Sequence, residues 1–340
     1  MPRRGTQGGV VSSSGTAAWT MDGVERPWQG QTSIYEQLVA QAERSSGVLP
    51  ISRGTTEQAV GCGGSTALAA SVVTCEVASA LAALLERASS VHLEALDHLL
   101  TRRGVWGVVH QACLSDVVKV KASAGRVRAL GQVLAREAPH LAGVRLGLAL
   151  LGTLSDGDDR ALLLELGAHE ELTDHAAAAL LHQTNDPRSV LTLARSVSGW
   201  GRIHAVERLG ETTDPEIQAW LLREGFRNTV NDEQLAFTCA LAGDLHVALG
   251  AASVDDALMR GAAEIFVALG CALSPPDLAD YPFREAAIAA WLGHLRERRP
   301  RASELCALQV LADCPEVSVE QRLAIAALQR ALGVELNRSS

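Results

Sequence analysis

The sequence predicts an all-α protein built from stacked helical pairs, and three observations lead to this prediction. The stretch Asn185 to Phe226 contains two capped helix starts with a further helix between them. Aromatic residues make up only 4% of the chain, which favours closely packed helices over a β-sandwich, whose strands need aromatic and β-branched side chains. A Leu-Gly pair also recurs, at Leu130-Gly131, Leu166-Gly167, Leu209-Gly210, Leu249-Gly250 and Leu269-Gly270.

Two Asp-Pro dipeptides mark the helix starts, Asp186-Pro187 and Asp214-Pro215. An aspartate at the N-cap accepts hydrogen bonds from free amides of the first turn, and a following proline loses nothing because its position needs no donor. Between them, apolar residues at helical spacing predict a helix from Gly201 to Leu209. Gly210 is interpreted as its stop, because glycine readily adopts the left-handed cap conformation.

The run Arg202-Ile-His-Ala205-Val-Glu-Arg-Leu209-Gly210, followed by Thr213-Asp214-Pro215-Glu216, resembles the HEAT-like, or armadillo-type, repeats of bacterial scaffold and lyase-type proteins. The resemblance covers about one and a half repeats and is degenerate over residues 156–270. It implies a right-handed α-solenoid. A helical pair of this kind cannot bury its apolar face alone and needs stacked neighbours.

Composition and spacing divide the chain into five segments. A tail rich in Gly, Ser and Thr is expected to be disordered, although its Trp19 and Trp28 either pack back on the body or anchor a partner. The segments are a disordered tail (1–33), a short helix with a Gly/Ser-rich linker (34–64), an N-terminal helical array (65–150), the HEAT-like repeat region (151–334) and a disordered C-terminus (335–340).

Caps and apolar stripes predict the individual helices. Besides Gly201–Leu209 and the helix that follows Asp214, they are Ile34–Arg44, Ala67–Leu85, Val91–Leu100, Val105–Leu114, Gly125–Arg136, Leu141–Leu151, Arg160–Leu166, Gln234–Leu241, Leu245–Leu249, Ala257–Leu269, Arg284–Arg296, Glu304–Ala312 and Val319–Leu332.

The segment Ala67–Leu85 is the most apolar and is long enough to suggest a membrane span. Glu76 lies at its centre, however, and a central acid costs about 2.5–3.5 kcal/mol on insertion scales. We therefore expect this segment to be a buried first helix of the array, and we expect no membrane association.

Charge is unevenly distributed along a chain of net charge −9. Eight basic and two acidic residues lie between Thr101 and Leu150, a local net charge of +6, whereas the remainder after Leu150 is acidic. A globally acidic protein is a poor default binder of nucleic acid, because neutralisation of phosphates drives that binding. The candidate partner-binding residues come from this basic segment and from the stretch around Trp200. They are Arg102, Arg103, Lys119, Lys121, Arg126, Arg128, Trp200 and Arg202.

Chemical motifs give no catalytic assignment. The sequence contains no G-x-S-x-G elbow, no phosphate-binding G-x-x-x-x-G-K and no strand-linked G-x-G-x-x-G. The histidines and acids between His169 and His182, and those around His92 and His98, lack the i, i+4 spacing that places two ligands on one helical turn. Seven cysteines, with no C-x-x-C, indicate reduced thiols and a cytoplasmic protein. We predict no metal and no cofactor.

The first functional hypothesis is a non-enzymatic scaffold that binds another protein on a curved helical surface. The alternative is a nucleic-acid binder or a DNA glycosylase-like enzyme, because certain alkylpurine glycosylases are built on HEAT-like repeats. Trp200, Arg202, Trp220 and Arg223 with Glu224 would then imitate their basic face and lesion site. Convergence of the basic residues beside an exposed tryptophan and a carboxylate would favour this alternative.

Overall fold

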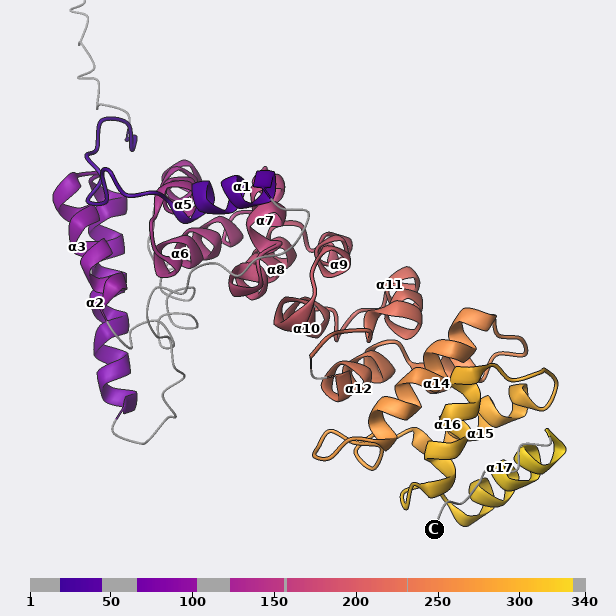
Figure 1. Ribbon diagram of the computed structural model, residues 1–340. Helices are drawn as coiled ribbons and strands as arrows, with labels where there is room; N and C mark the ends of the chain where they lie inside the picture. The colour runs from indigo at the N-terminus through magenta and orange to yellow at the C-terminus, as the bar shows by residue number, and fades with distance from the viewer. Residues whose placement is uncertain (1–18, 45–65, 103–122, 156–157, 231, 333–340) are drawn as a thin grey trace, which may run out of the picture.

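The computed structural model describes residues 19–44, 66–102, 123–155, 158–230 and 232–332. Over these residues the chain forms helices and no strand, which confirms the all-α prediction. Figure 1 shows the helices from residue 66 onward following one another along an elongated, bent path to the C-terminal end, while the helix of residues 34–44 lies beside the helix of residues 124–137.

The helices agree with the predicted ones to within a few residues, and only the predicted helix Val105–Leu114 lies outside the described residues. The elements are α1 (Ile34–Arg44), α2 (Thr66–Glu86), α3 (Ser90–Thr101), α5 (Ala124–Glu137), α6 (Leu141–Gly152), α7 (Arg160–Gly167), α8 (Glu170–Thr184), α9 (Pro187–Ser196), α10 (Gly199–Glu207), α11 (Pro215–Trp220), the π-helical turn η1 (Leu221–Gly225), α12 (Asp232–Ala242), α13 (Leu245–Leu249), α14 (Asp256–Gly270), α15 (Arg284–Leu295), α16 (Ala302–Asp313) and α17 (Val319–Ala331).

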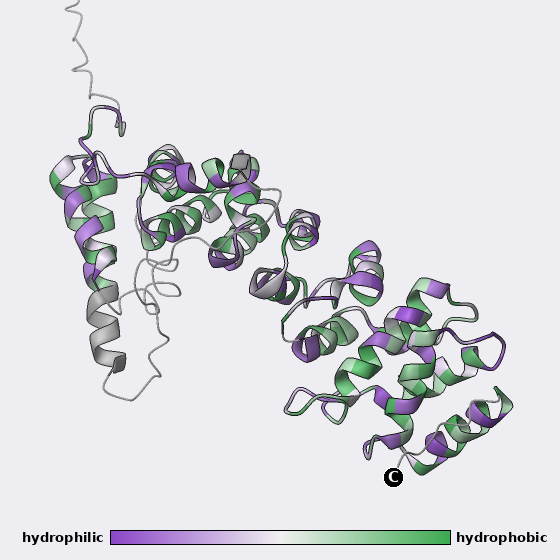
Figure 2. Cartoon of the chain, in the orientation of Figure 1, coloured by the Kyte–Doolittle hydropathy of each residue, from purple (hydrophilic) through white to green (hydrophobic). Residues whose placement is uncertain are grey.

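Consecutive helices pair, and alternate helices stack. Helix α5 packs on α6, α7 on α8, and α9 on α10. The second helix of each pair contacts the second helix of the next, so that α6, α8, α10, α12, α14 and α16 form one continuous row. Figure 2 shows apolar and hydrophilic residues alternating along most of the helices, as expected where one side packs on neighbours and the other meets solvent.

The two aspartate caps predicted before Pro187 and Pro215 are present. The carboxylate of Asp186 accepts from the amide of Arg188 at 3.0 Å, and that of Asp214 accepts from the amide of Glu216 at 2.9 Å. Asp255 caps α14 in the same way, through the amide of Leu258 at 2.7 Å. Each of these aspartates therefore fixes the residue at which a helix begins.

The Leu-Gly pairs have a different function from the predicted one. Among the described glycines, only Gly23, Gly30 and Gly199 have positive φ, so the interpretation of Gly210 and its counterparts as left-handed stops is wrong. A Cβ on Gly131 would lie 2.9 Å from the Leu151 side chain, and one on Gly167 would lie 2.6 Å from that of Ala176. At these two positions glycine is required because neighbouring helices approach closely.

The segment that precedes α1 packs against α5. Trp28 is 4% exposed, and the Arg26 guanidinium pairs with the Glu137 carboxylate at 2.6 Å. The amide of Ile34 donates to the carbonyl of Ala138 at 3.0 Å. Disorder was predicted as far as residue 33, whereas residues 19–33 are held against the body, and Trp28 follows the alternative of packing back. Among the described helices, none combines the length and apolarity needed to cross a membrane.

Candidate protein-binding surface around Trp200

Two of the predicted basic contact residues, Arg102 and Arg126, make contacts within the N-terminal part of the chain. Arg102, at the end of α3, pairs with Glu76 of α2 at 3.0 Å. Arg126 donates to the carbonyl of Leu85 at 3.1 Å, and its guanidinium lies 5.8 Å from the Trp19 ring. The contacts of Arg126 hold the end of α2 and the N-terminal segment against α5.

Arg202 joins α10 to the π-helical turn. Its guanidinium donates to the carbonyls of Glu224 at 2.8 Å and Gly225 at 3.2 Å, and it lies 5.2 Å from the Trp220 ring. Burial lowers the pKa of Arg202 below the ordinary arginine value. Arg202 is therefore a structural residue in this conformation. Arg103, Lys119 and Lys121 lie outside the described residues.

Arg128 belongs to a recurring set of contacts, which we call the cap ladder. In each rung, a side chain of the first helix in one pair binds a polar side chain at the start of the first helix in the next pair. The separations along the chain are 31, 29, 26 and 26 residues. The rungs are Arg128–Asp159 (3.0 Å), Arg160–Ser189 (3.0 Å), Arg188–Asp214 (2.9 Å) and Gln218–Asp244 (3.1 Å).

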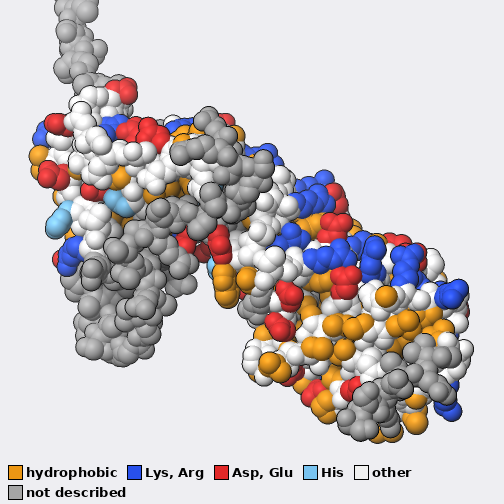
Figure 3. Space-filling model, viewed as in Figure 1, with side chains coloured by type: hydrophobic (Ala, Val, Ile, Leu, Met, Phe, Trp, Pro, Cys, Tyr) orange, Lys and Arg blue, Asp and Glu red, His pale blue; other side chains and the backbone are white. Residues whose placement is uncertain are grey.

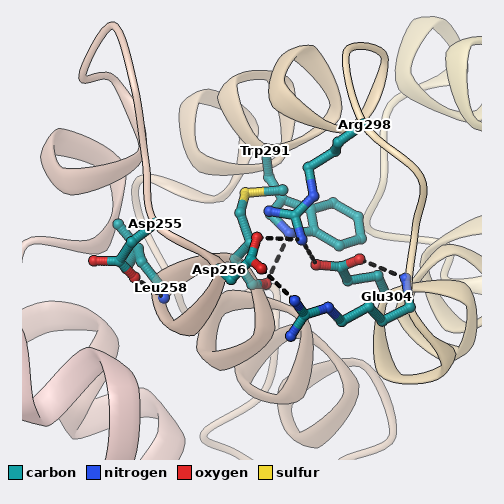
Figure 4. Close-up of polar contacts among 8 residues, drawn as sticks. Asp255, Asp256, Leu258, Trp291, Arg298 and Glu304 are labelled. Atoms are coloured by element: carbon teal, nitrogen blue, oxygen red, sulfur yellow. Dashed lines mark hydrogen bonds and ion pairs between the residues drawn. The ribbon is translucent and has the colours of Figure 1, made fainter.

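A second polar network lies between α14 and the start of α16 (Figure 4). Arg298 bridges Asp256 and the fully buried Glu304, each at 3.0 Å, and Arg301 also pairs with Asp256. The second Glu304 oxygen accepts from the backbone amide of Arg301 at 2.7 Å. Each charge in this network has an opposite partner, so it secures the helix connection. Figure 3 likewise shows blue basic side chains interleaved with red acidic ones along one edge of this part of the molecule.

The histidines of the two clusters make contacts of other kinds. In the described part of the chain, no three His, Cys, Asp or Glu side chains converge as a metal site would require. His169 lies just before α8, where burial lowers the pKa of its imidazole. Asp97 of the other cluster binds the Nε2 atom of His140 at 2.5 Å, while Nδ1 of His140 accepts from the amide of Gly143 and caps α6.

Trp200 differs from these residues because its indole is 50% exposed on a rigid backbone. Gly199 adopts φ +62°, and both its N–H and its carbonyl bind the side chain of Asn228, at 2.9 and 3.0 Å. The amide of Trp200 donates to the Glu170 carboxylate at 3.0 Å. Helix α8 and the loop before α12 thus hold the first turn of α10 from two sides.

Two acidic residues make polar contacts with this part of α10. Glu170 lies at the base of Trp200, and His204 lies one turn further along α10, with ring centroids 6.5 Å apart. The Nδ1 atom of His204 is 3.6 Å from the carboxylate of Glu207. We define Glu170, Trp200, His204 and Glu207 as the Trp200 surface.

The loop that clamps Gly199 leads into α12, which begins with Asp232 and Glu233. Burial, and then repulsion from Glu233, raises the pKa of Asp232. A carboxyl group whose charge is disfavoured in this way gains from an incoming cation. An exposed indole face beside carboxylates has the chemistry to bind a guanidinium or ammonium group.

Comparison with protein-family models, with curated proteins and with solved structures gives no match for this chain. The arrangement of its own residues therefore carries the functional argument.

The sequence analysis identified Trp200 but not its companions. His204 and Glu207 follow Trp200 by four and seven residues, the spacing that places side chains on one helical face, so this part of the surface was visible in the sequence. Glu170 was assigned only to a metal candidate, because nothing in the local sequence indicates that its carboxylate reaches the start of α10.

Proposed function

We propose that the protein is a non-enzymatic interaction scaffold, a right-handed α-solenoid of HEAT-like pairs that binds a basic segment of a partner protein on the Trp200 surface. The observation that carries the proposal is the half-exposed Trp200, whose backbone is held by Glu170 of α8, with Glu207 paired to His204 on the same face of α10. The row of stacked second helices supports the solenoid part of the proposal, because nearest-neighbour stacking is how such arrays are built.

The rigidity of this surface favours binding. Tryptophan supplies much of the binding energy in many protein interfaces, and a residue already fixed in place loses little entropy when a partner arrives. The backbone of Trp200 is fixed by the contacts of Gly199 with Asn228 and by its own bond to Glu170. A basic side chain resting on the indole would gain both a cation–π contact and an ion pair.

The chain's charge points to the same kind of partner. At a net charge of −9, the protein attracts basic segments and repels phosphate backbones. The described basic contact residues are spread over α3, α5 and α10, where they bind carboxylates, carbonyls and rings of this chain. The nucleic-acid alternative therefore gains no support from them.

Selection of random displayed peptides on the purified full chain tests the proposal. We expect enrichment of sequences with arginine or lysine next to an apolar residue. A synthetic peptide of the selected sequence should bind the W200A variant at least about tenfold more weakly, the loss expected when a partly desolvated cation–π contact is removed. The E170Q/E207Q variant should bind more weakly and with less dependence on salt.

The matched control is V91A, which truncates another exposed apolar side chain, 70% exposed on α3. It should bind the peptide as the wild type does. Enrichment of acidic or uncharged peptides, or equal affinities of W200A and the wild type, would overturn the proposal. A labelled DNA duplex that binds more tightly than the selected peptide at moderate salt would favour the nucleic-acid alternative.

A further inference from the structure

Helix α17 leaves one stripe of its surface exposed. Its buried side, with Gln321, Ile325 and Leu328, packs toward α15 and α16. The side chain of Gln321 donates to the carbonyl of Glu285 at 2.8 Å and fixes the helix against the start of α15. The exposed positions are Val319, Glu320, Leu323, Ala327, Arg330 and Ala331.

This stripe is apolar along its middle and charged near its ends. Val319 and Leu323 are each 66% exposed, a degree unusual for two large apolar side chains one helical turn apart. Glu320 lies in the first turn of α17 and Arg330 in the last turn. The Nε atom of Arg330 donates to the carbonyl of Ala326 at 3.2 Å, which keeps the guanidinium beside the stripe.

The stripe is self-complementary about Ile325. Its exposed positions are spaced symmetrically around that residue, six, five and two positions to either side. If a second α17 runs antiparallel across the first, the large Leu323 faces the small Ala327, and Glu320 faces Arg330. A parallel pairing would instead place like charges opposite one another. Antiparallel pairing also sets the helix dipoles in opposite directions, which is the favourable arrangement.

We propose that α17 is a self-association surface on which two copies of this chain pair antiparallel about a twofold axis. A twofold interface uses the same patch on both partners, so the patch must complement itself, as this stripe does. Leucine against alanine allows the two helices to approach closely while filling the space between them.

One helix pair buries less than the roughly 1,200 Å² of a standard stable interface. We therefore expect a reversible dimer with a dissociation constant on the order of 10 μM.

Sedimentation equilibrium of the full chain, over about a hundredfold range of concentration around this value, tests the proposal. The wild type should pass from monomer to dimer. E320R and R330E should each weaken the dimer at least about tenfold, since each places like charges opposite one another at both ends of the interface. The double variant E320R/R330E restores the opposite charges and should dimerise like the wild type.

Mixing the two single variants gives the sharpest result. In E320R the stripe on α17 is positive at both ends, and in R330E it is negative at both ends. An equimolar mixture should therefore form a heterodimer, although each variant alone stays monomeric. Circular dichroism establishes that every variant is folded. E94R, which reverses an exposed charge on α3, and W200A should leave dimerisation unchanged.

Three results would overturn the proposal. They are a wild type that stays monomeric throughout the range, a dimer unaffected by E320R and by R330E, and single variants that do not associate when mixed. The proposal is independent of the peptide-binding function, because W200A and the α17 variants alter separate surfaces.

Discussion

Two adjacent aspartates, Asp158 and Asp159, show how burial sets the energetic weight of a single charge. Asp159 is 3% exposed and accepts from Arg128 at 3.0 Å and from Gln132 at 2.6 Å. The side chain of Asp158 is 73% exposed and lies 3.8 Å from Arg128. Asp159 therefore satisfies groups that would otherwise lose their partner away from water.

We expect D159A to lower the free energy of unfolding by about 2–4 kcal/mol, because it leaves a partly buried guanidinium and an amide without their acceptor. D158A should change it by less than about 0.5 kcal/mol, as is usual for exposed positions. Urea unfolding followed by circular dichroism measures both. Equal losses in the two variants would contradict a structural function for the rung Arg128–Asp159.

The titration of His169 makes the free energy of unfolding depend on pH, and the sign of this dependence follows from its pKa shift. Burial lowers the pKa of its imidazole in the folded state, so the unfolded chain binds that proton more tightly. Stability is therefore lost as the pH falls from above the unfolded value, about 6.5, toward the folded pKa. H169Q removes the titrating group.

The wild type should lose more free energy of unfolding between pH 7 and pH 5 than H169Q does. Urea unfolding at the two pH values compares them, and a loss of the same size in both chains would show that His169 does not contribute. H98Q, a substitution at an exposed histidine of α3, is the control and should retain the wild-type pH dependence.

Residue-scale chemistry was predictable where it is local to the sequence. The aspartate caps at Asp186 and Asp214 were predicted and are present. The function of Arg202 was not, because its acceptors, the carbonyls of Glu224 and Gly225, lie 22 and 23 residues further along the chain. Nothing in the neighbouring residues indicates such a contact.

At the scale of the elements, the π-helical turn η1 depends on a glycine in another helix. A Cβ added to Gly261 of α14 would lie 2.0 Å from the carbonyl oxygen of Leu222 in η1. That oxygen belongs to the backbone, so it moves only if the turn itself moves. Gly293 of α15 is the opposite case, because a Cβ there meets nothing within 4 Å.

We expect G261A to lower the free energy of unfolding by about 3 kcal/mol, a large overpacking cost. G293A should raise it by about 0.5–1 kcal/mol, since alanine is the better helix former. Thermal and urea unfolding of the pair measure the difference. A neutral G261A would show that α14 and η1 are not held at this separation.

The elements also show why the Leu-Gly pairs were wrongly predicted to be left-handed helix stops. Glycine is common both at left-handed helix ends and where helices touch, and a sequence pattern alone does not distinguish these uses. Helix starts were predicted correctly because an N-cap aspartate with a proline has one dominant meaning. The π-helical turn was not predicted, since Leu221 to Gly225 read as an ordinary continuation of α11.

At the scale of the whole molecule, a local loss of stability should affect only the helices next to it in the row. The second helices form a row in which α8 contacts α6 and α10, and α14 contacts α12 and α16. In such quasi-linear arrays, each unit is coupled chiefly to the next one.

Hydrogen exchange of the G261A variant, followed by mass spectrometry, tests this behaviour. Amide exchange should accelerate in η1, α12 and α14, while α5 to α8 keep their wild-type rates. Uniform acceleration along the whole chain would show a single cooperative unit instead. The G293A variant serves as the control and should show no acceleration in η1 and α12.

The molecule's charge distribution was only partly understood from the sequence. The basic segment between Thr101 and Leu150 was interpreted as a contact face, and whether its residues outside the described ranges bind a partner stays a prediction. Its described members Arg126 and Arg128 make internal contacts. The near-regular spacing of arginines and aspartates was present in the sequence, but only the structure shows that they meet.

The cap ladder has a consequence for how the gene that encodes this chain can gain repeats. Arg188 and Asp214 form one rung, and both Asp186 and Asp214 are followed by proline. An in-frame tandem duplication of residues 187–214 would create the junction Asp214-Pro187, the same dipeptide as the natural one. Every copy of Arg188 would then find an aspartate at the distance it already uses. The ladder contact is thus preserved at the seam when the chain is extended by this unit.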